Sequence, residues 1–170
     1  MPIENEYKYV LRYDDDLPDA TMAYAAHIKQ GYLYPEVRIR MTEHPGVKGK
    51  PEATCYFTFK SQTPEGLVEI EHEMQRVDFD RLWPKTHNRL EKTRFSFLEG
   101  DNHWDVDLFG NHNDPYFVLA EVEVAESRPD PGICKRLAPW HVRQVGKDPA
   151  FLSYRLSDEN YARNLMATLR

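Results

Sequence analysis

The sequence predicts a mainly β protein that folds as an antiparallel sandwich or barrel. Polar and apolar residues alternate with a period of two along most of the chain, which is typical of strands with unlike faces. The alternating segments are short and are separated by Gly, Pro, Asn or Asp. Seven or eight such segments with few and short helices indicate an antiparallel sandwich or barrel.

The alternation predicts the strands in order. The first runs from Ile3 to Leu11, with Tyr7 and Tyr9 on one side and Glu6 and Lys8 on the other. Further strands are expected at Val37–Met41, Thr54–Lys60, Val68–Met74, Lys92–Phe97, Trp104–Phe109 and Phe117–Val124.

Helices are expected in only a few places. Asp78 is a plausible N-cap for a short helix that ends at Leu82, just before Pro84. Ser157 is expected to cap a last helix, whose apolar residues fall on one face: Tyr161, Leu165 and Leu169. Asp14–Gln30 is expected to be a loop or helical turn, and Arg128–Pro139, with three prolines, a loop.

Length and composition predict one globular domain over residues 1–170. The net charge of −6 should repel nucleic acid and anionic membrane surfaces, so neither is an expected partner. Two cysteines, Cys55 and Cys134, are too few for a disulfide framework. The first residues do not resemble a signal peptide and no apolar run could span a bilayer, so we expect a cytoplasmic protein.

The charged residues of the predicted strands form same-face pairs two positions apart. They are Glu4/Glu6/Lys8, Arg38/Arg40, Glu71/Glu73, Lys92/Arg94, Asp105/Asp107 and Glu121/Glu123, with Lys60 alone. Such residues could simply be the solvent-facing side of one-sided sheets. However, most pairs share a sign, and like charges in this arrangement repel unless something binds between them. Glu121 and Glu123 also lie in an otherwise apolar strand, where carboxylates persist when paired or bound to metal.

A sheet that closes with these faces inward would gather acids and bases in one lumen. Carboxylate oxygens suit hard cations such as Mg²⁺ or Mn²⁺. Clustered Arg and Lys side chains suit phosphate oxygens. The pattern therefore predicts a site for a complex of metal and polyphosphate.

The order and spacing of eight short segments resemble the CYTH superfamily, the triphosphate tunnel metalloenzymes. The segments are Glu4–Lys8 (ExExK), Gln30–Leu33 (QGYL), Val37–Arg40 (VRIR), Thr58–Lys60 (TFK), Glu71–Glu73 (EHE), Glu91–Phe95 (EKTRF), Trp104–Phe109 (WDVDLF) and Ala120–Val124 (AEVEV). The resemblance implies a closed eight-stranded antiparallel β-barrel, or tunnel, with a few short peripheral helices. It also implies a small-molecule triphosphate substrate, two Mg²⁺ or Mn²⁺ ions, and by analogy a possible homodimer.

The resemblance also implies a role for each charged position. The implied metal ligands are Glu4, Glu6, Glu121 and Glu123, with Asp107 supporting a second ion. The implied phosphate contacts are Arg38, Arg40, Lys60 and Arg94. Lys8 and Lys92 are the implied catalytic pair, in which one ammonium lowers the pKa of the other so that it can act as a base. Glu71, Glu73 and Asp105 are expected to support the site.

Four functions remain open at the level of the sequence. The leading hypothesis is hydrolysis of inorganic triphosphate to pyrophosphate and phosphate. Family resemblance also allows an adenylate cyclase or thiamine triphosphatase, and a polyphosphate- or nucleotide-binding sensor would not be an enzyme at all. The chain departs from the family at Glu69 and Lys29, where many members have Arg, and in the segment Trp140–Gly146. No zinc-site spacing, phosphate-binding loop or GxSxG motif is present.

Overall fold

The computed structural model describes residues 5–21, 24–125 and 127–169. Its described residues form nine strands, joined in one antiparallel sheet with the order β5-β4-β3-β2-β6-β7-β8-β1-β9. The strands are β1 (Glu6–Leu11), β2 (Tyr24–Tyr34), β3 (Val37–Glu43), β4 (Ala53–Thr63), β5 (Gly66–Met74), β6 (His87–Glu99), β7 (Asn102–Asn111), β8 (Asp114–Glu123) and β9 (His141–Gly146). The prediction of a mainly β, antiparallel protein is confirmed.

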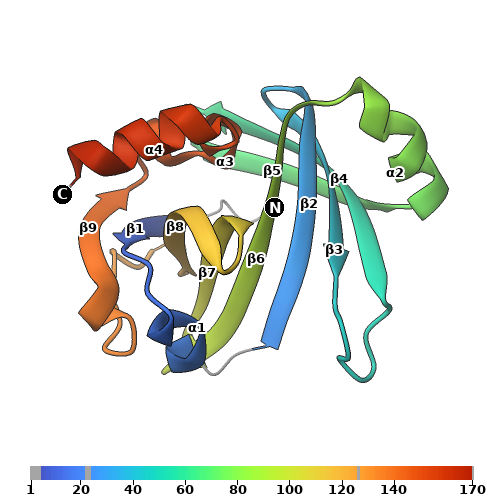
Figure 1. Cartoon of the computed structure of the whole chain (residues 1–170). Helices are drawn as coiled ribbons and strands as arrows, with labels where there is room; N and C mark the ends of the chain where they lie inside the picture. Colours follow the sequence, from blue (N-terminus) through green and yellow to red (C-terminus); the bar gives the residue numbers. More distant parts are fainter. Residues whose placement is uncertain (1–4, 22–23, 126, 170) are drawn as a thin grey trace.

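The prediction of a closed eight-stranded barrel is wrong. The sheet has two edges, β5 and β9, which do not pair with each other. The additional strand, β9, pairs with β1, so that β1 lies between β8 and β9. The sheet is nevertheless strongly curved and wraps partly around its inner face (Figure 1).

Helices are few and short, as predicted. They are α1 (Asp16–Thr21), α2 (Arg76–Leu82), α3 (Ser153–Leu156) and α4 (Glu159–Thr168), with 3₁₀ turns η1 (Trp83–Lys85), η2 (Ala138–Trp140) and η3 (Pro149–Phe151). The N-cap of α4 is Asp158, whose carboxylate accepts a hydrogen bond from the Tyr161 amide, and not the predicted Ser157. Likewise α2 begins before Asp78, the predicted cap. None of the described helices is long and apolar enough to cross a membrane.

Two strands were not predicted. β2 occupies Tyr24–Tyr34, where a loop or helical turn was expected, and only the preceding α1 is helical. β2 lies at the centre of the sheet, between β3 and β6. β9 falls in the segment after Trp140 that departs from the family pattern.

The outer face of the sheet is covered by two apolar clusters. Tyr9, Trp104 and Val122 belong to the larger one, which α1 and the segment around Leu137 complete. The second cluster joins Ile39 and other residues of β3 and β4 to Phe79 of α2. These contacts leave the opposite, even-numbered side of β1 and β3 facing inward.

A third cluster closes one end of the inner face. Val10, Phe109 and Leu119 pack there against Phe151, Leu156 and other residues of the C-terminal segment. Figure 1 shows α3 and α4 lying over this end of the sheet. The remainder of the inner face, farther along the same strands, carries the charged residues.

Candidate active site

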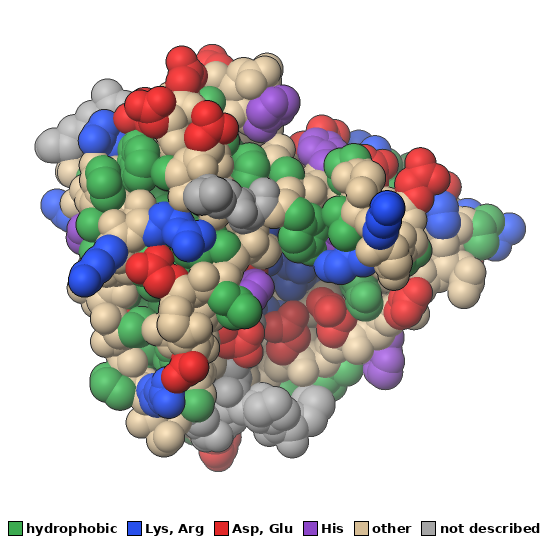
Figure 2. Space-filling model, turned by 90° about the horizontal axis from the view of Figure 1, so that it is seen from below, with side chains coloured by type: hydrophobic (Ala, Val, Ile, Leu, Met, Phe, Trp, Pro, Cys, Tyr) green, Lys and Arg blue, Asp and Glu red, His purple; other side chains and the backbone are tan. Residues whose placement is uncertain are grey.

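The concave face of the sheet holds a cavity of about 950 Å³. Charged side chains from seven strands line it, and residues between Lys147 and Tyr154 complete its wall. Seen from below, the molecule is hollowed, and both basic and acidic side chains gather in the hollow (Figure 2).

Most of the predicted site residues line this one cavity although the sheet is open. They are Glu6, Lys8, Arg38, Arg40, Lys60, Glu71, Lys92, Arg94, Asp105, Glu121 and Glu123. Asp107 lies beneath the lining with its side chain fully buried, and Glu73 is exposed outside the cavity. Glu4 falls outside the described residues. Period-2 alternation brings these side chains together because it places them all on one face.

Asp107 is the centre of a buried ionic cluster. Its Oδ1 accepts a hydrogen bond from Arg94 Nε at 2.6 Å, and its Oδ2 accepts from Arg94 Nη2 at 2.7 Å and from Lys92 Nζ. Burial would raise the pKa of Asp107, but the two cations hold it well below its usual range. Burial lowers the pKa of Lys92 to about 8, and repulsion from Arg94 and Arg40 acts in the same direction.

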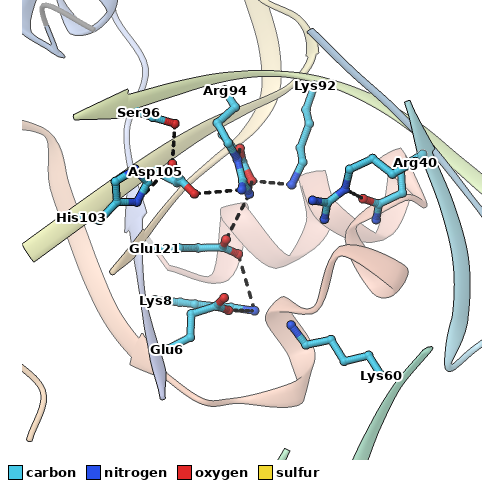
Figure 3. Close-up of polar contacts among 12 residues, drawn as sticks. Glu6, Lys8, Arg40, Lys60, Lys92, Arg94, Ser96, His103, Asp105 and Glu121 are labelled. Carbon is cyan, nitrogen blue, oxygen red and sulfur yellow. Dashed lines mark hydrogen bonds and ion pairs between the residues drawn. The ribbon is translucent and has the colours of Figure 1, made fainter. Parts of the chain in front are cut away.

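Arg94 extends this cluster toward the acidic side of the cavity. Its Nη1 donates to Asp105 at 2.8 Å and its Nη2 to Glu121 at 3.2 Å. Glu121 also approaches Lys8 at 3.6 Å, and Lys8 pairs with Glu6 at 3.1 Å (Figure 3). Together these contacts make a chain of alternating charge across β6, β7, β8 and β1.

The acidic end of the chain is formed by neighbouring strands. Glu6 of β1 lies directly opposite Glu123 of β8, and Lys8 lies opposite Glu121. Burial would raise the pKa of Glu6, but Lys8, Lys60 and Arg94 lower it to about 2. Glu6 therefore carries a negative charge at neutral pH, with a second carboxylate beside it.

The basic side of the cavity lies across from these carboxylates. Lys60 of β4 points toward Lys8 from the opposite side of the cavity (Figure 3). Arg38 and Lys60 both pair with Glu69, at 3.2 and 3.4 Å. Arg38 Nε is buried and has no hydrogen-bond partner in the described parts of the chain. A buried donor of this kind is costly unless a ligand or water satisfies it.

Arg40 differs from Arg94 in its surroundings. It forms no ion pair with any other residue that the structure describes, and its Nε donates to the neutral side chain of Gln30 at 3.1 Å. Burial, together with repulsion from Arg38 and Arg94, lowers the pKa of Arg40 to about 10. Arg40 is still charged at neutral pH, and it lines the cavity from β3.

Three features of the site were not predicted from the sequence. Gln30 contacts Arg40, Glu69 contacts two of the predicted phosphate ligands, and Lys147–Tyr154 lines the cavity. Gln30 belongs to the QGYL segment, and Glu69 stands where many family members have Arg. Either observation could have drawn attention to these residues. The C-terminal residues carried none, because their contribution depends on how the chain returns to the sheet.

The carboxylates at the open side have the donor chemistry of a hard divalent cation. Glu6, Glu121 and Glu123 offer only oxygen atoms, which Mg²⁺ and Mn²⁺ prefer. Within the described residues no three His, Cys, Asp or Glu side chains are already gathered as a metal cluster. By contrast, both oxygens of Asp107 are occupied by Arg94 and Lys92, which suits a structural counter-ion.

Comparison with known proteins relates the chain to an inorganic triphosphatase. It is 30% identical over 137 residues to an inorganic triphosphatase from Nitrosomonas europaea, covering 79% of this chain and 85% of that enzyme. The chain belongs to the family of this inorganic triphosphatase. The described charged cavity is therefore the candidate active site of a family member. No protein-family profile matches the chain.

Solved structures were compared with the fold of this chain. The crystal structure of the hypothetical protein NE1496 has a TM-score of 0.52 and 25% identity, covering 91% of this chain and 97% of its own. A Bacillus halodurans structure, provisionally described as an adenylate cyclase, has a TM-score of 0.48 and 14% identity, covering 72% of this chain and 81% of its own. The second likeness is too weak to carry an argument about activity.

Proposed function

We propose that this protein is a metal-dependent hydrolase of the CYTH superfamily that cleaves inorganic triphosphate to pyrophosphate and phosphate. The observation that carries the proposal is the convergence of six cationic side chains of the strands, together with a group of carboxylates, on one concave cavity. The cations are Lys8, Arg38, Arg40, Lys60, Lys92 and Arg94. The family relationship to an inorganic triphosphatase supports the choice of substrate.

The arrangement separates two kinds of binding partner. The basic side suits the phosphate oxygens, and Arg38 and Arg40 each retain donors that the described residues do not satisfy with carboxylates. The opposite side suits a cation, with Glu6, Glu121 and Glu123 as ligands and Glu4 as a further candidate. A bound divalent ion would neutralise phosphate charge and bring a water molecule close to the phosphorus. Asp107 is assigned here to holding Lys92 and Arg94 in place.

Hydrolysis in such a site requires positioning, charge stabilisation and a proton acceptor. Water attacks the terminal phosphorus, the bond to the bridging oxygen breaks, and pyrophosphate leaves. Lys92 is the group suited to accept the proton of that water, because its lowered pKa makes the neutral amine accessible near neutral pH. Arg38, Arg40 and Lys60 would stabilise the charge on the phosphate oxygens. Lys8, between Glu6 and Glu121, would orient these carboxylates.

The proposal is tested by measuring phosphate release from inorganic triphosphate with Mg²⁺, with Mn²⁺ and with EDTA. We expect turnover with either metal and none with EDTA. Lys8→Met and Glu121→Gln should reduce kcat/KM by at least about 100-fold, as loss of charge stabilisation does in other enzymes. The matched controls are Lys48→Met and Glu52→Gln, two exposed positions on the loop after β3. Full activity in either site variant would contradict the assignment.

The same assay separates the other candidate activities. ATP and thiamine triphosphate are offered in parallel, and cyclic AMP is measured together with phosphate. Preference for ATP with cyclic AMP as product would identify a cyclase, and preference for thiamine triphosphate would change the substrate. Tight triphosphate binding without any product would identify a sensor.

A further inference from the structure

Gln30 is a fully buried polar side chain on the inner face of β2. None of its surface is exposed, and its neighbours on the same face of the strand, Ile28 and Tyr32, are also buried. Both ends of its amide are used, because Oε1 accepts from Arg40 Nε and Nε2 donates to the Tyr32 hydroxyl at 2.8 Å. A buried amide satisfied in this way has one preferred orientation.

Arg40 is held by a neutral amide, whereas the other two arginines of the cavity, Arg38 and Arg94, are held by carboxylates. Arg94 is anchored by Asp105, Asp107 and Glu121, and Arg38 by Glu69, so carboxylates partly neutralise both. Gln30 instead anchors Arg40 through a neutral oxygen. The amide fixes the direction of the guanidinium and leaves its positive charge available to an anion.

Arg40 and Tyr32 together hold the amide of Gln30. If the amide were reversed, its NH₂ group would point at the guanidinium, two donors would meet and the hydrogen bond would be lost. The Tyr32 hydroxyl accepts from Nε2 and so holds the other end of the amide in place. Tyr32 is itself held by an edge-on contact with Tyr154 of α3, with ring centroids 5.0 Å apart. The C-terminal segment thus supports the orientation of Arg40 through two intervening side chains.

We propose that Gln30 is a positioning residue that aims the Arg40 guanidinium at a phosphate group of the substrate without neutralising it. The inference rests on the proposed function, because it requires an anionic substrate in the cavity. Gln30 does not touch the substrate, and Tyr32 and Tyr154 act through it. An anchoring carboxylate at position 30 would orient Arg40 equally well but would weaken its attraction for phosphate.

The test compares Gln30→Met, which keeps the volume and removes both hydrogen bonds, with Gln30→Glu, which keeps an oxygen beside Arg40 and adds charge. We expect KM for inorganic triphosphate to rise roughly 10-fold in each variant, because a hydrogen bond to a charged group contributes about this much. The value of kcat should change less than about threefold. Gln75→Met, at an exposed position before α2, is the matched control and should behave as wild type.

A double-mutant cycle with Arg40→Ala distinguishes positioning from a general structural effect. If Gln30 acts through Arg40, adding Gln30→Met to Arg40→Ala should change KM by less than about twofold. Independent, multiplicative effects would overturn the inference. If Gln30→Met does not fold, Tyr32→Phe carries the test, because it removes only the hydroxyl that holds the Nε2 end of the amide in place, and an unchanged KM would then overturn the inference.

Failure of this inference can be told from failure of the proposed function. Titration of the wild-type protein with inorganic triphosphate by calorimetry, in EDTA, measures binding without turnover. If the wild type neither binds nor hydrolyses triphosphate, the proposed function fails. If the wild type does both and the position 30 variants match it, only the role of Gln30 fails.

Discussion

Asp107→Asn should be among the most destabilising conservative substitutions in the protein. The side chain is fully buried, and its two oxygens accept three contacts from Arg94 and Lys92. Replacing the carboxylate by an amide leaves two buried cations without their common counter-ion, with Arg40 also nearby. Removal of one partner from a buried ion pair costs about 3–5 kcal/mol. For a domain of this size that corresponds to a fall in Tm of about 6–20 °C.

Urea unfolding followed by circular dichroism measures this cost, with Asp101→Asn in the exposed turn between β6 and β7 as the control. The control should change the free energy of unfolding by less than about 0.5 kcal/mol. Adding Lys92→Met to Asp107→Asn should recover about 1–3 kcal/mol, because it removes one of the unpaired cations. A cost below 1 kcal/mol for Asp107→Asn, or no recovery in the double variant, would refute the counter-ion role.

Three further predictions concern other parts of the molecule. Glu69→Gln should lower KM for triphosphate severalfold, because it removes the carboxylate that competes for Arg38 and Lys60; an unchanged or higher KM would contradict this reasoning. Because the pKa of Glu6 falls from 4.5 unfolded to about 2 folded, its contribution of up to about 3 kcal/mol is present above pH 4.5 and is lost as the pH falls toward 2. Thermal melts in EDTA from pH 6 to 2 should therefore decline less steeply for Glu6→Gln than for wild type. Gly31→Ala should cost about 1–3 kcal/mol in urea unfolding without changing KM, because its Cβ would lie 2.7 Å from a Thr86 side-chain atom on the outer face.

The charged site could be predicted from the sequence because side chains alternate between the two faces of a strand, so the position of a residue determines its face. Arg38 and Arg40, or Glu121 and Glu123, must share a face whatever the curvature of the sheet. The apolar residues between them, such as Ile39 and Val122, are buried in the outer clusters and so fix which face is inward. This reasoning does not depend on whether the sheet closes.

Closure of the sheet could not be predicted in the same way. It depends on whether the two edge strands meet, and that is decided by the accumulated twist and curvature of all the strands between them. Neither β5 nor β9 carries a sequence signal for its missing partner. β9 is a short and largely exposed strand without alternation, and its pairing with β1 includes register shifts. The resemblance to a family with a closed barrel therefore led to the wrong prediction that this sheet closes.

β2 was missed because its inward residues are not charged. Its alternation is carried by Ala26, Ile28, Gln30 and Tyr32, and alanine and glycine in the same segment weaken the strand signal. Glycine is nevertheless required at position 31, because a Cβ atom there would collide with the side chains of Thr86 and Trp83 on the outer face of the sheet. The strand that supplies the proposed positioning residue was therefore the one with the weakest pattern.

Charged residues on the inner face differ in burial, and this difference explains why some form internal ion pairs and others are available to a ligand. At the closed end, Phe109 and Leu119 are buried, and the adjacent Lys92 is paired with the buried Asp107. Toward the open side, Glu6 and Glu123 lie opposite each other, and Arg38 and Arg40 keep donors that no carboxylate among the described residues fills. The positive charges of Arg38 and Arg40 are therefore available to a bound anion, although the chain as a whole has a net charge of −6. We expect the buried ion cluster to make the site rigid, and the incompletely paired cations beside it to attract an anion.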